Sequence, residues 1–106
     1  MKKLDLANLI IDLKMSLSKN PAPVKRVGIF GSLVKGQVND DSDIDIAVEF
    51  EQGESFEFFQ FVKFCELCEA LRVDISQIYG RKIDVVHVEE KEGSFLDEIR
   101  QEVVWL

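Results

Sequence analysis

The sequence Gly31-Ser32, followed after ten intervening residues by Asp43-Ile44-Asp45, is the most informative stretch of this 106-residue chain. Residues 24–30 alternate partly and are rich in β-branched side chains, so they predict a strand that ends at the Gly31-Ser32 turn. Glycine at such a turn lets the backbone approach a ligand closely. If Ser32 starts a short helix that ends near Gly36, its N–H groups and hydroxyl favour an anion such as a triphosphate.

Apolar and polar side chains alternate cleanly over residues 43–50, which predicts a strand with one apolar and one acidic face. Asp43 and Asp45 lie on the acidic face, which we expect to be open. Two carboxylates at roughly 4 Å repel each other by about 4 kcal/mol at an effective dielectric constant of about 20. A cation removes that repulsion, and sites built only from oxygen ligands suit Mg²⁺ or Mn²⁺.

A further acid is expected from a neighbouring strand. Residues 82–88 read as a strand, and Asp84 is its acidic residue. Acids from two adjacent strands could hold two metal ions and activate a hydroxyl group. The pattern therefore predicts phosphoryl chemistry on a metal-bound nucleotide.

Composition indicates one small domain spanning residues 1–106, with 46% hydrophobic residues, including eight Phe, to build a core. The net charge of −7 argues against a sequence-independent grip on nucleic acid, which needs clustered Lys and Arg. A nucleotide carried with Mg²⁺, or a protein partner, fits better. Because no signal peptide or long apolar span is evident, we expect a cytoplasmic protein with no membrane contact.

The remaining elements follow from periodicity and caps. Apolar residues from Leu6 to Leu17 recur at helical spacing after Asp5, which is a plausible cap. A long helix is expected over residues 56–79, which could break near Val73, and Gly80 closes it. A last helix, capped by Ser94, is expected to run to the C-terminus.

Apolar side chains cover about 240° of the predicted helix 56–79, whereas packing on one sheet needs only a little over 100°. The surplus can be covered by this chain's other helices or by another protein. A homodimer or a hetero-oligomer through this Phe-rich helix is therefore a hypothesis.

Two other features could in principle carry chemistry. Cys65 and Cys68 form a single C-x-x-C in mid-helix, where a redox pair or half of a zinc site is less plausible than packing. His87, the only histidine, has no partner visible in the sequence, so we interpret it as structural or surface-exposed.

The segments just described resemble the minimal nucleotidyltransferase domain of the DNA polymerase β superfamily. The similarity covers the chain from about Val24 onward and includes the last ten residues, which look like the family's closing helix. It rests on three motifs in order: Phe30-Gly31-Ser32-Leu33-Val34-Lys35-Gly36, Ser42-Asp43-Ile44-Asp45-Ile46-Ala47-Val48 and Arg81-Lys82-Ile83-Asp84-Val85-Val86. The implied fold is α+β, a polymerase β-like nucleotidyltransferase fold with a small mixed three-stranded core sheet and helices packed on one face.

The resemblance also implies roles for individual residues. Gly31 and Ser32 would hold the phosphates of ATP, while Asp43 and Asp45 would bridge two Mg²⁺ ions. Asp84 would share one ion and take the proton from the incoming hydroxyl. Lys35 is placed to offset phosphate charge, although a solvated turn lysine is an equally good interpretation.

Stand-alone members of this family are often antitoxins that transfer AMP to a tyrosine of a partner toxin, a HEPN-fold ribonuclease. The resemblance thus implies a protein adenylyltransferase with a HEPN partner. Two alternatives remain open: nucleotidyl transfer to a small-molecule alcohol, and a non-catalytic antitoxin that inhibits its partner by binding. The three mutually repelling acids argue against the second alternative, because a site released from catalysis has no reason to keep them.

Overall fold

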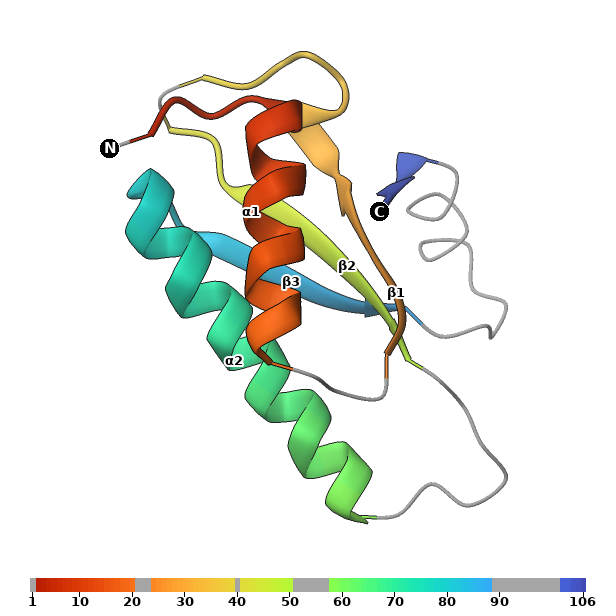
Figure 1. The fold of residues 1–106 in the computed structure, drawn as a ribbon. Helices are drawn as coiled ribbons and strands as arrows, with labels where there is room; N and C mark the ends of the chain where they lie inside the picture. The colour runs from red at the N-terminus through yellow and green to blue at the C-terminus, as the bar shows by residue number, and fades with distance from the viewer. Residues whose placement is uncertain (1, 21–23, 40, 51–57, 89–101) are drawn as a thin grey trace.

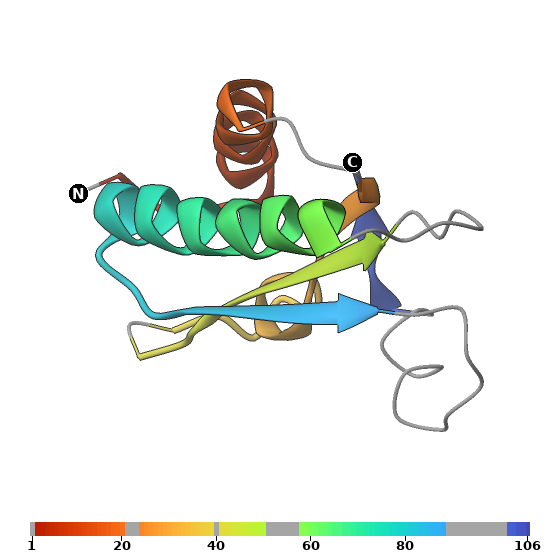
Figure 2. The same ribbon diagram turned by 90° about the horizontal axis from the view of Figure 1, so that it is seen from below.

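A computed structural model describes residues 2–20, 24–39, 41–50, 58–88 and 102–106. A four-stranded mixed sheet has the strand order β3-β2-β1-β4. Strand β1 (Val24–Phe30) runs antiparallel to β2 (Ile44–Phe50), and β3 (Ile83–Val88) is parallel to β2. Helices α1 (Leu6–Lys19) and α2 (Phe58–Tyr79) lie on the same side of this sheet (Figures 1 and 2). The predicted fold class is confirmed, with one strand more than expected.

The core lies between the helices and the sheet. Strand β2 directs Ile44, Ile46 and Val48 toward the helices, and all three are fully buried. The helices contribute side chains at helical spacing: Leu9 and Leu13 from α1, and Phe64, Leu67, Leu71, Ile75 and Tyr79 from α2. The alternation in β2 therefore separates a buried face from a second face that is free to carry polar groups.

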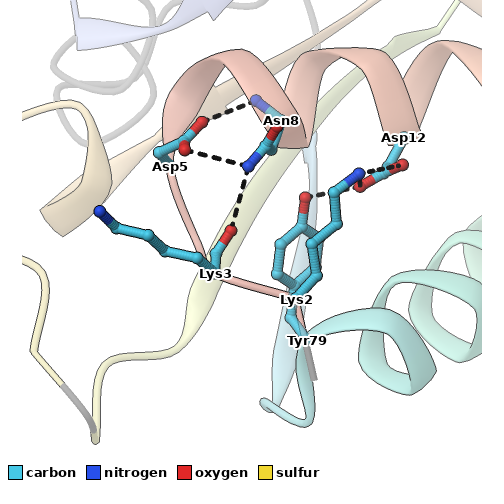
Figure 3. A network of polar contacts seen from close by, with 6 residues as sticks. All are labelled: Lys2, Lys3, Asp5, Asn8, Asp12 and Tyr79. Atoms are coloured by element: carbon cyan, nitrogen blue, oxygen red, sulfur yellow. Dashed lines mark hydrogen bonds and ion pairs between the residues drawn. The ribbon is translucent and has the colours of Figure 1, made fainter.

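Capping residues explain where α1 begins and where α2 ends. The side chain of Asp5 accepts a hydrogen bond of 2.8 Å from the backbone N–H of Asn8, as expected for an N-cap (Figure 3). Helix α2 continues unbroken through Val73, so the break considered there is wrong, because α2 contains neither glycine nor proline. Gly80 ends it with a φ of 63°, a conformation that glycine adopts without strain.

A polar network ties the N-terminal segment and α1 to the end of α2 (Figure 3). The Tyr79 hydroxyl donates a hydrogen bond of 2.6 Å to Asp12, and the Lys2 ammonium lies 3.1 Å from the same carboxylate. Burial raises the pKa of Tyr79, and its hydrogen bond to Asp12 raises that pKa further. Because β3 begins shortly after Tyr79, this network helps to fix where β3 enters the sheet.

The chain ends in a strand, and this corrects the sequence-based expectation of a helix running to the C-terminus. Strand β4 (Val104–Trp105) pairs antiparallel with β1, with Gly28 opposite Trp105. Val104 and Trp105 favour strands, and the Arg26 guanidinium lies 3.9 Å from the centre of the Trp105 ring. The proposed start of that helix, residues 94–101, lies outside the described residues.

Gly28 makes room for β4, which gives a first prediction. A Cβ atom at this position would lie 2.3 Å from Val103 Cγ1 and 2.9 Å from Trp105 Cε3. We expect Gly28→Ala to displace β4, lower the melting temperature and shift the emission of Trp105, the only tryptophan, to longer wavelength. Thermal denaturation and intrinsic fluorescence test this, and an unchanged spectrum would contradict the assigned position of β4.

Candidate active site

The second face of the sheet carries the acids singled out in the sequence. Asp45 follows Ile44 in β2, so its side chain points away from the two helices. Asp45 lies opposite Asp84 in the parallel pairing of β2 with β3. Because paired residues of a sheet share a face, the two carboxylates are neighbours.

The electrostatics of Asp45 follow from this position. Burial raises its pKa first, the charge of Asp84 raises it next, and the charge of Asp43 adds a smaller increase. Asp45 is thus the centre of the acidic group, flanked by one acid from its own chain segment and one from β3. The anionic form of Asp45 is the form that the fold makes costly.

The Gly31-Ser32 turn lies against the same carboxylate. Gly31 begins η1 (Gly31–Leu33), a single turn of 3₁₀ helix, and has a φ of 80°. A Cβ atom on Gly31 would lie 2.1 Å from Asp45 Oδ2, so only glycine allows this approach. The turn that could take a phosphate and the acid that could take a cation are therefore in direct contact.

The short helix expected after Ser32 is thus a 3₁₀ turn, followed by a turn that reaches Gly36, whose φ is 70°. The C=O of Ser32 accepts a hydrogen bond of 2.8 Å from the N–H of Gln37, which closes the loop. So short a helix has almost no macrodipole. Anion binding there would depend on individual N–H groups and on the Ser32 hydroxyl.

Lys35 does not point to the acids. Its ammonium lies 3.4 Å from Glu102, just before β4, and both side chains are nearly half exposed. Lys35 therefore links the Gly31-Ser32 loop to the C-terminal segment. Offsetting phosphate charge would require Lys35 to leave Glu102, and an exposed ion pair of this kind opposes that only weakly.

The acidic face is open only at the Asp45 end, which corrects the expectation of an open face along the whole strand. Ala47 is fully buried beneath Phe30, Val86, Val103 and Trp105. Glu49 is 2% exposed and forms ion pairs with Arg26 and Lys25. The C-terminal residues, whose position was not predicted, cover this half of the face.

A cavity of about 650 Å³ opens beside Asp45 and Asp84. It extends around the edge of β3 to α2, which contributes Arg72 and Ser76, and its remaining lining residues are Phe30, Lys82, Ile83, Val85 and Val86. Sequence reasoning missed Arg72 and Ser76, because nothing local indicates that this turn of α2 overhangs β3. Their contribution depends on tertiary packing alone.

The acids suit a divalent cation by their chemistry, because two carboxylates on paired strands repel each other and offer only oxygen ligands. Within the described ranges, no three or more His, Cys, Asp or Glu side chains are grouped closely enough to form a complete metal site by themselves. Asp43, Asp45 and Asp84, expected from the sequence to converge, are therefore not grouped as one metal site in these ranges. A cation held by Asp45 and Asp84 would complete its coordination with water, nucleotide phosphate or the Asp43 carboxylate. Mg²⁺ commonly keeps waters and substrate phosphates as ligands in this way.

Cys65, Cys68 and His87 do not line this cavity. Both thiols lie on α2, Cys65 exposed and Cys68 half-buried, and burial raises the pKa of Cys68, which makes a reactive thiolate less accessible. The His87 ring lies 5.0 Å from the Phe64 ring. The positions of Cys68 and His87 agree with the packing and surface roles preferred from the sequence, whereas Cys65 is exposed rather than packed.

The comparison with protein families settles the class. The model described as "Polymerase beta, Nucleotidyltransferase" matches residues 12–106. The chain belongs to the polymerase beta nucleotidyltransferase family. The family and the enzyme class predicted from the sequence, a nucleotidyltransferase, are confirmed.

Two curated relatives and two solved structures are similar to this nucleotidyltransferase. "Putative protein adenylyltransferase MJ0435" of Methanocaldococcus jannaschii is 32% identical over 81 residues, 76% of this chain and 77% of the relative. "Protein adenylyltransferase MntA" of Thermococcus cleftensis is 40% identical over 53 residues, 49% of this chain and 54% of the relative.

The solved structures show that the fold is shared. A "putative minimal nucleotidyltransferase" superposes with a TM-score of 0.68 and 23% identity, with complete coverage of both chains. A toxin-antitoxin crystal structure with AMP-PNP has a TM-score of 0.56 and 21% identity, covering 92% of this chain and 69% of that one.

None of the helices in the described ranges is long and apolar enough to cross a membrane.

Contact between Gly31 and Asp45 gives a second prediction, with Gly36→Ala as its matched control. Both glycines have positive φ, so alanine at either position should cost about 1–2 kcal/mol of stability. Only Gly31→Ala also forces a methyl group onto Asp45, whereas nothing lies within 4 Å of a Cβ at Gly36. We expect Gly31→Ala to abolish ATP turnover and Gly36→Ala to retain most of it.

The raised pKa of Asp45 gives a third prediction, which concerns the thermal stability of the protein in the absence of metal. A carboxyl whose pKa is raised by folding stabilises the fold below its unfolded pKa, about 3.9, and loses that contribution as pH rises through the folded value. At pH 7, well above the unfolded pKa, the raised pKa of Asp45 therefore makes a net destabilising contribution, and Asp45→Asn should raise the melting temperature.

The difference in melting temperature between Asp45→Asn and the wild type should shrink as the pH falls below about 4. Added Mg²⁺ should stabilise the wild type more than the variant, since cation binding to the folded state shifts the equilibrium. Circular dichroism melts at several pH values measure both effects. A variant less stable than the wild type at pH 7 would contradict this account.

Proposed function

We propose that this nucleotidyltransferase transfers AMP from ATP, in the presence of Mg²⁺, to a hydroxyl group of a protein acceptor. The observation that carries the proposal is the contact of Gly31 with Asp45 while Asp84 lies beside Asp45 in register. A triphosphate resting on the Gly31-Ser32 turn would have its phosphate oxygens next to these carboxylates. Mn²⁺ is a chemically reasonable substitute for Mg²⁺.

Different residues of this chain would bind the phosphates, hold the metal ions and offset the remaining charge. Gly31 and Ser32 would hold phosphate oxygens through backbone N–H groups and a hydroxyl. Asp43, Asp45 and Asp84 would hold one or two Mg²⁺ ions, which neutralise phosphate charge when bound. Lys35, released from Glu102, would offset remaining negative charge.

Asp84 would also receive the proton from the acceptor. The acceptor oxygen forms a bond to the α-phosphorus of ATP as the bond from that phosphorus to the bridging oxygen of pyrophosphate breaks. The acceptor proton passes to the Asp84 carboxylate, and pyrophosphate leaves. Placing Asp84 on the edge strand β3 suits this role, since an acceptor can approach it from outside the sheet.

We propose further that the acceptor is a tyrosine of a HEPN-fold ribonuclease toxin, so that this chain acts as an antitoxin. The relatives named protein adenylyltransferases support transfer to a protein, and the toxin-antitoxin structure with AMP-PNP supports a toxin partner and ATP. The start of helix α2 offers an apolar docking surface, since Phe58 is 80%, Phe61 48% and Val62 36% exposed. Such surfaces are typical of protein contacts, which disfavours a small alcohol as acceptor.

A fourth prediction tests this function directly. ATP labelled in its α-phosphate, Mg²⁺ and the protein encoded by the neighbouring reading frame should yield that protein carrying AMP, identified on its tyrosine by mass spectrometry. Asp43→Asn and Asp45→Asn should lower the rate about a thousandfold or more, because each removes several kcal/mol of charge stabilisation. Ser32→Ala should weaken the reaction without abolishing it.

The outcomes separate the alternatives. Label on a small alcohol but on no protein would favour the small-molecule reaction. Inhibition of the partner's ribonuclease activity that survives Asp45→Asn and needs no ATP would favour inhibition by binding alone. Full turnover in either aspartate variant would remove the metal role assigned to these acids.

A further inference from the structure

Strand β3, which carries Asp84, forms an edge of the described sheet (Figure 1). It pairs with β2 on one side, and no strand of the described ranges pairs with its other side. An edge of this kind presents backbone donors and acceptors that can pair with another extended segment.

The hydrogen bonds to β2 determine which backbone groups of β3 point outward. The N–H of Ile44 donates a bond of 3.0 Å to the C=O of Lys82. In a parallel ladder, alternate residues direct both their N–H and their C=O groups to the same neighbouring strand. The backbone N–H and C=O of Asp84 therefore point to β2. Ile83 and Val85 therefore direct their N–H and C=O groups to the outer edge.

The cavity follows this outer edge. Five consecutive residues, Lys82 to Val86, line it together with Asp45 on one side and Arg72 and Ser76 of α2 on the other. Five residues of strand span about 16 Å, the length of a short peptide segment. The cavity volume of about 650 Å³ also lies in the range of ligand sites.

Charge distinguishes the two sides of this edge. The Arg72 guanidinium lies 2.7 Å from Glu69, with half of its side chain exposed, and the largely exposed Lys82 lies 3.9 Å from Asp84. One cation therefore lies on each side of the edge: Arg72 on the α2 side, next to Glu69, and Lys82 on the acidic side, next to Asp84. An incoming segment would gain from a carboxylate near Arg72, whereas its hydroxyl could reach Asp84.

We propose that the edge of β3 binds the acceptor as an extended peptide segment, which pairs with Ile83 and Val85 as an additional strand. The inference rests on the proposed function and specifies its substrate: a hydroxyl-bearing residue in an extended segment with acidic neighbours. Strand pairing supplies main-chain hydrogen bonds, and alternate side chains of the segment point to the Asp45 face. The hydroxyl oxygen then bonds to the α-phosphorus, its proton goes to Asp84, and pyrophosphate leaves.

The test uses the full chain with α-labelled ATP, Mg²⁺ and a pooled library of blocked heptapeptides with a central tyrosine, serine or threonine and random flanks. Peptides that accept AMP should be enriched in Asp and Glu. Each is then resynthesised with one N-methylated backbone amide at a time. Methylation should lower labelling at least about tenfold at every second position and less than about twofold at the positions between, because only alternate amides face β3.

A charge variant gives a second readout. Arg72→Glu should reduce the preference for acidic flanks about two- to fivefold, the range expected for an exposed ion pair, and favour basic flanks instead. Lys14→Glu, an exposed residue of α1 that does not line the cavity, is the matched control and should leave the preference unchanged.

Each remaining outcome has a definite meaning. A wild-type chain that neither binds nor turns over ATP contradicts the proposed function. A chain that labels a folded protein but no peptide, or that labels peptides with no alternation in the methylation scan, contradicts edge pairing and leaves nucleotidyl transfer intact. An unchanged flank preference in Arg72→Glu contradicts the role of Arg72 in selecting acidic flanks.

Discussion

The parallel pairing of β2 with β3, in the register that sets Asp45 opposite Asp84, is the constraint on which the site depends. Because side chains alternate along a strand, a slip of one residue would turn one of these acids into the core and an apolar residue out to solvent. The fully buried Ile44 and Ile46 hold β2 against such a slip, since each would otherwise be exposed. Packing on one face of the sheet thus positions the chemistry on the other.

The close contacts around this site depend on glycines, which have no side chain. Gly31 touches Asp45 only because it has no side chain, and Gly28 admits β4 for the same reason. Each glycine gives up stabilising contacts of its own and allows two backbone segments or a carboxylate to approach. The acids themselves oppose folding through burial and mutual repulsion, so the helical side of the sheet must supply the compensating stability.

Much of this arrangement could be predicted from the sequence, because the decisive signals are local. The strand predicted over residues 43–50 is found at Ile44–Phe50, so that Asp43 lies just before it, and the cap at Asp5 and the stop at Gly80 were placed correctly. All three signals depend on neighbours in the chain. The strand at residues 104–105 was not predicted, because these residues form a strand only by pairing with β1. Gly28 and Ile29, their partners in β1, are far away in the sequence. The burial of Glu49 and the overhang of Arg72 were missed for the same reason: each depends on a segment brought in by tertiary packing.

The pairing of Val104 with Ile29 also bears on how the protein forms in the cell. Contacts between distant positions are entropically costly to close and slow the search for the native state. During translation, β1 emerges well before β4, so the side of β1 that pairs with β4 stays uncovered until residues 104–105 have been made. Nascent chains should therefore pass through a stage in which β1 is vulnerable to intermolecular pairing, and in that stage chaperones would be of most use.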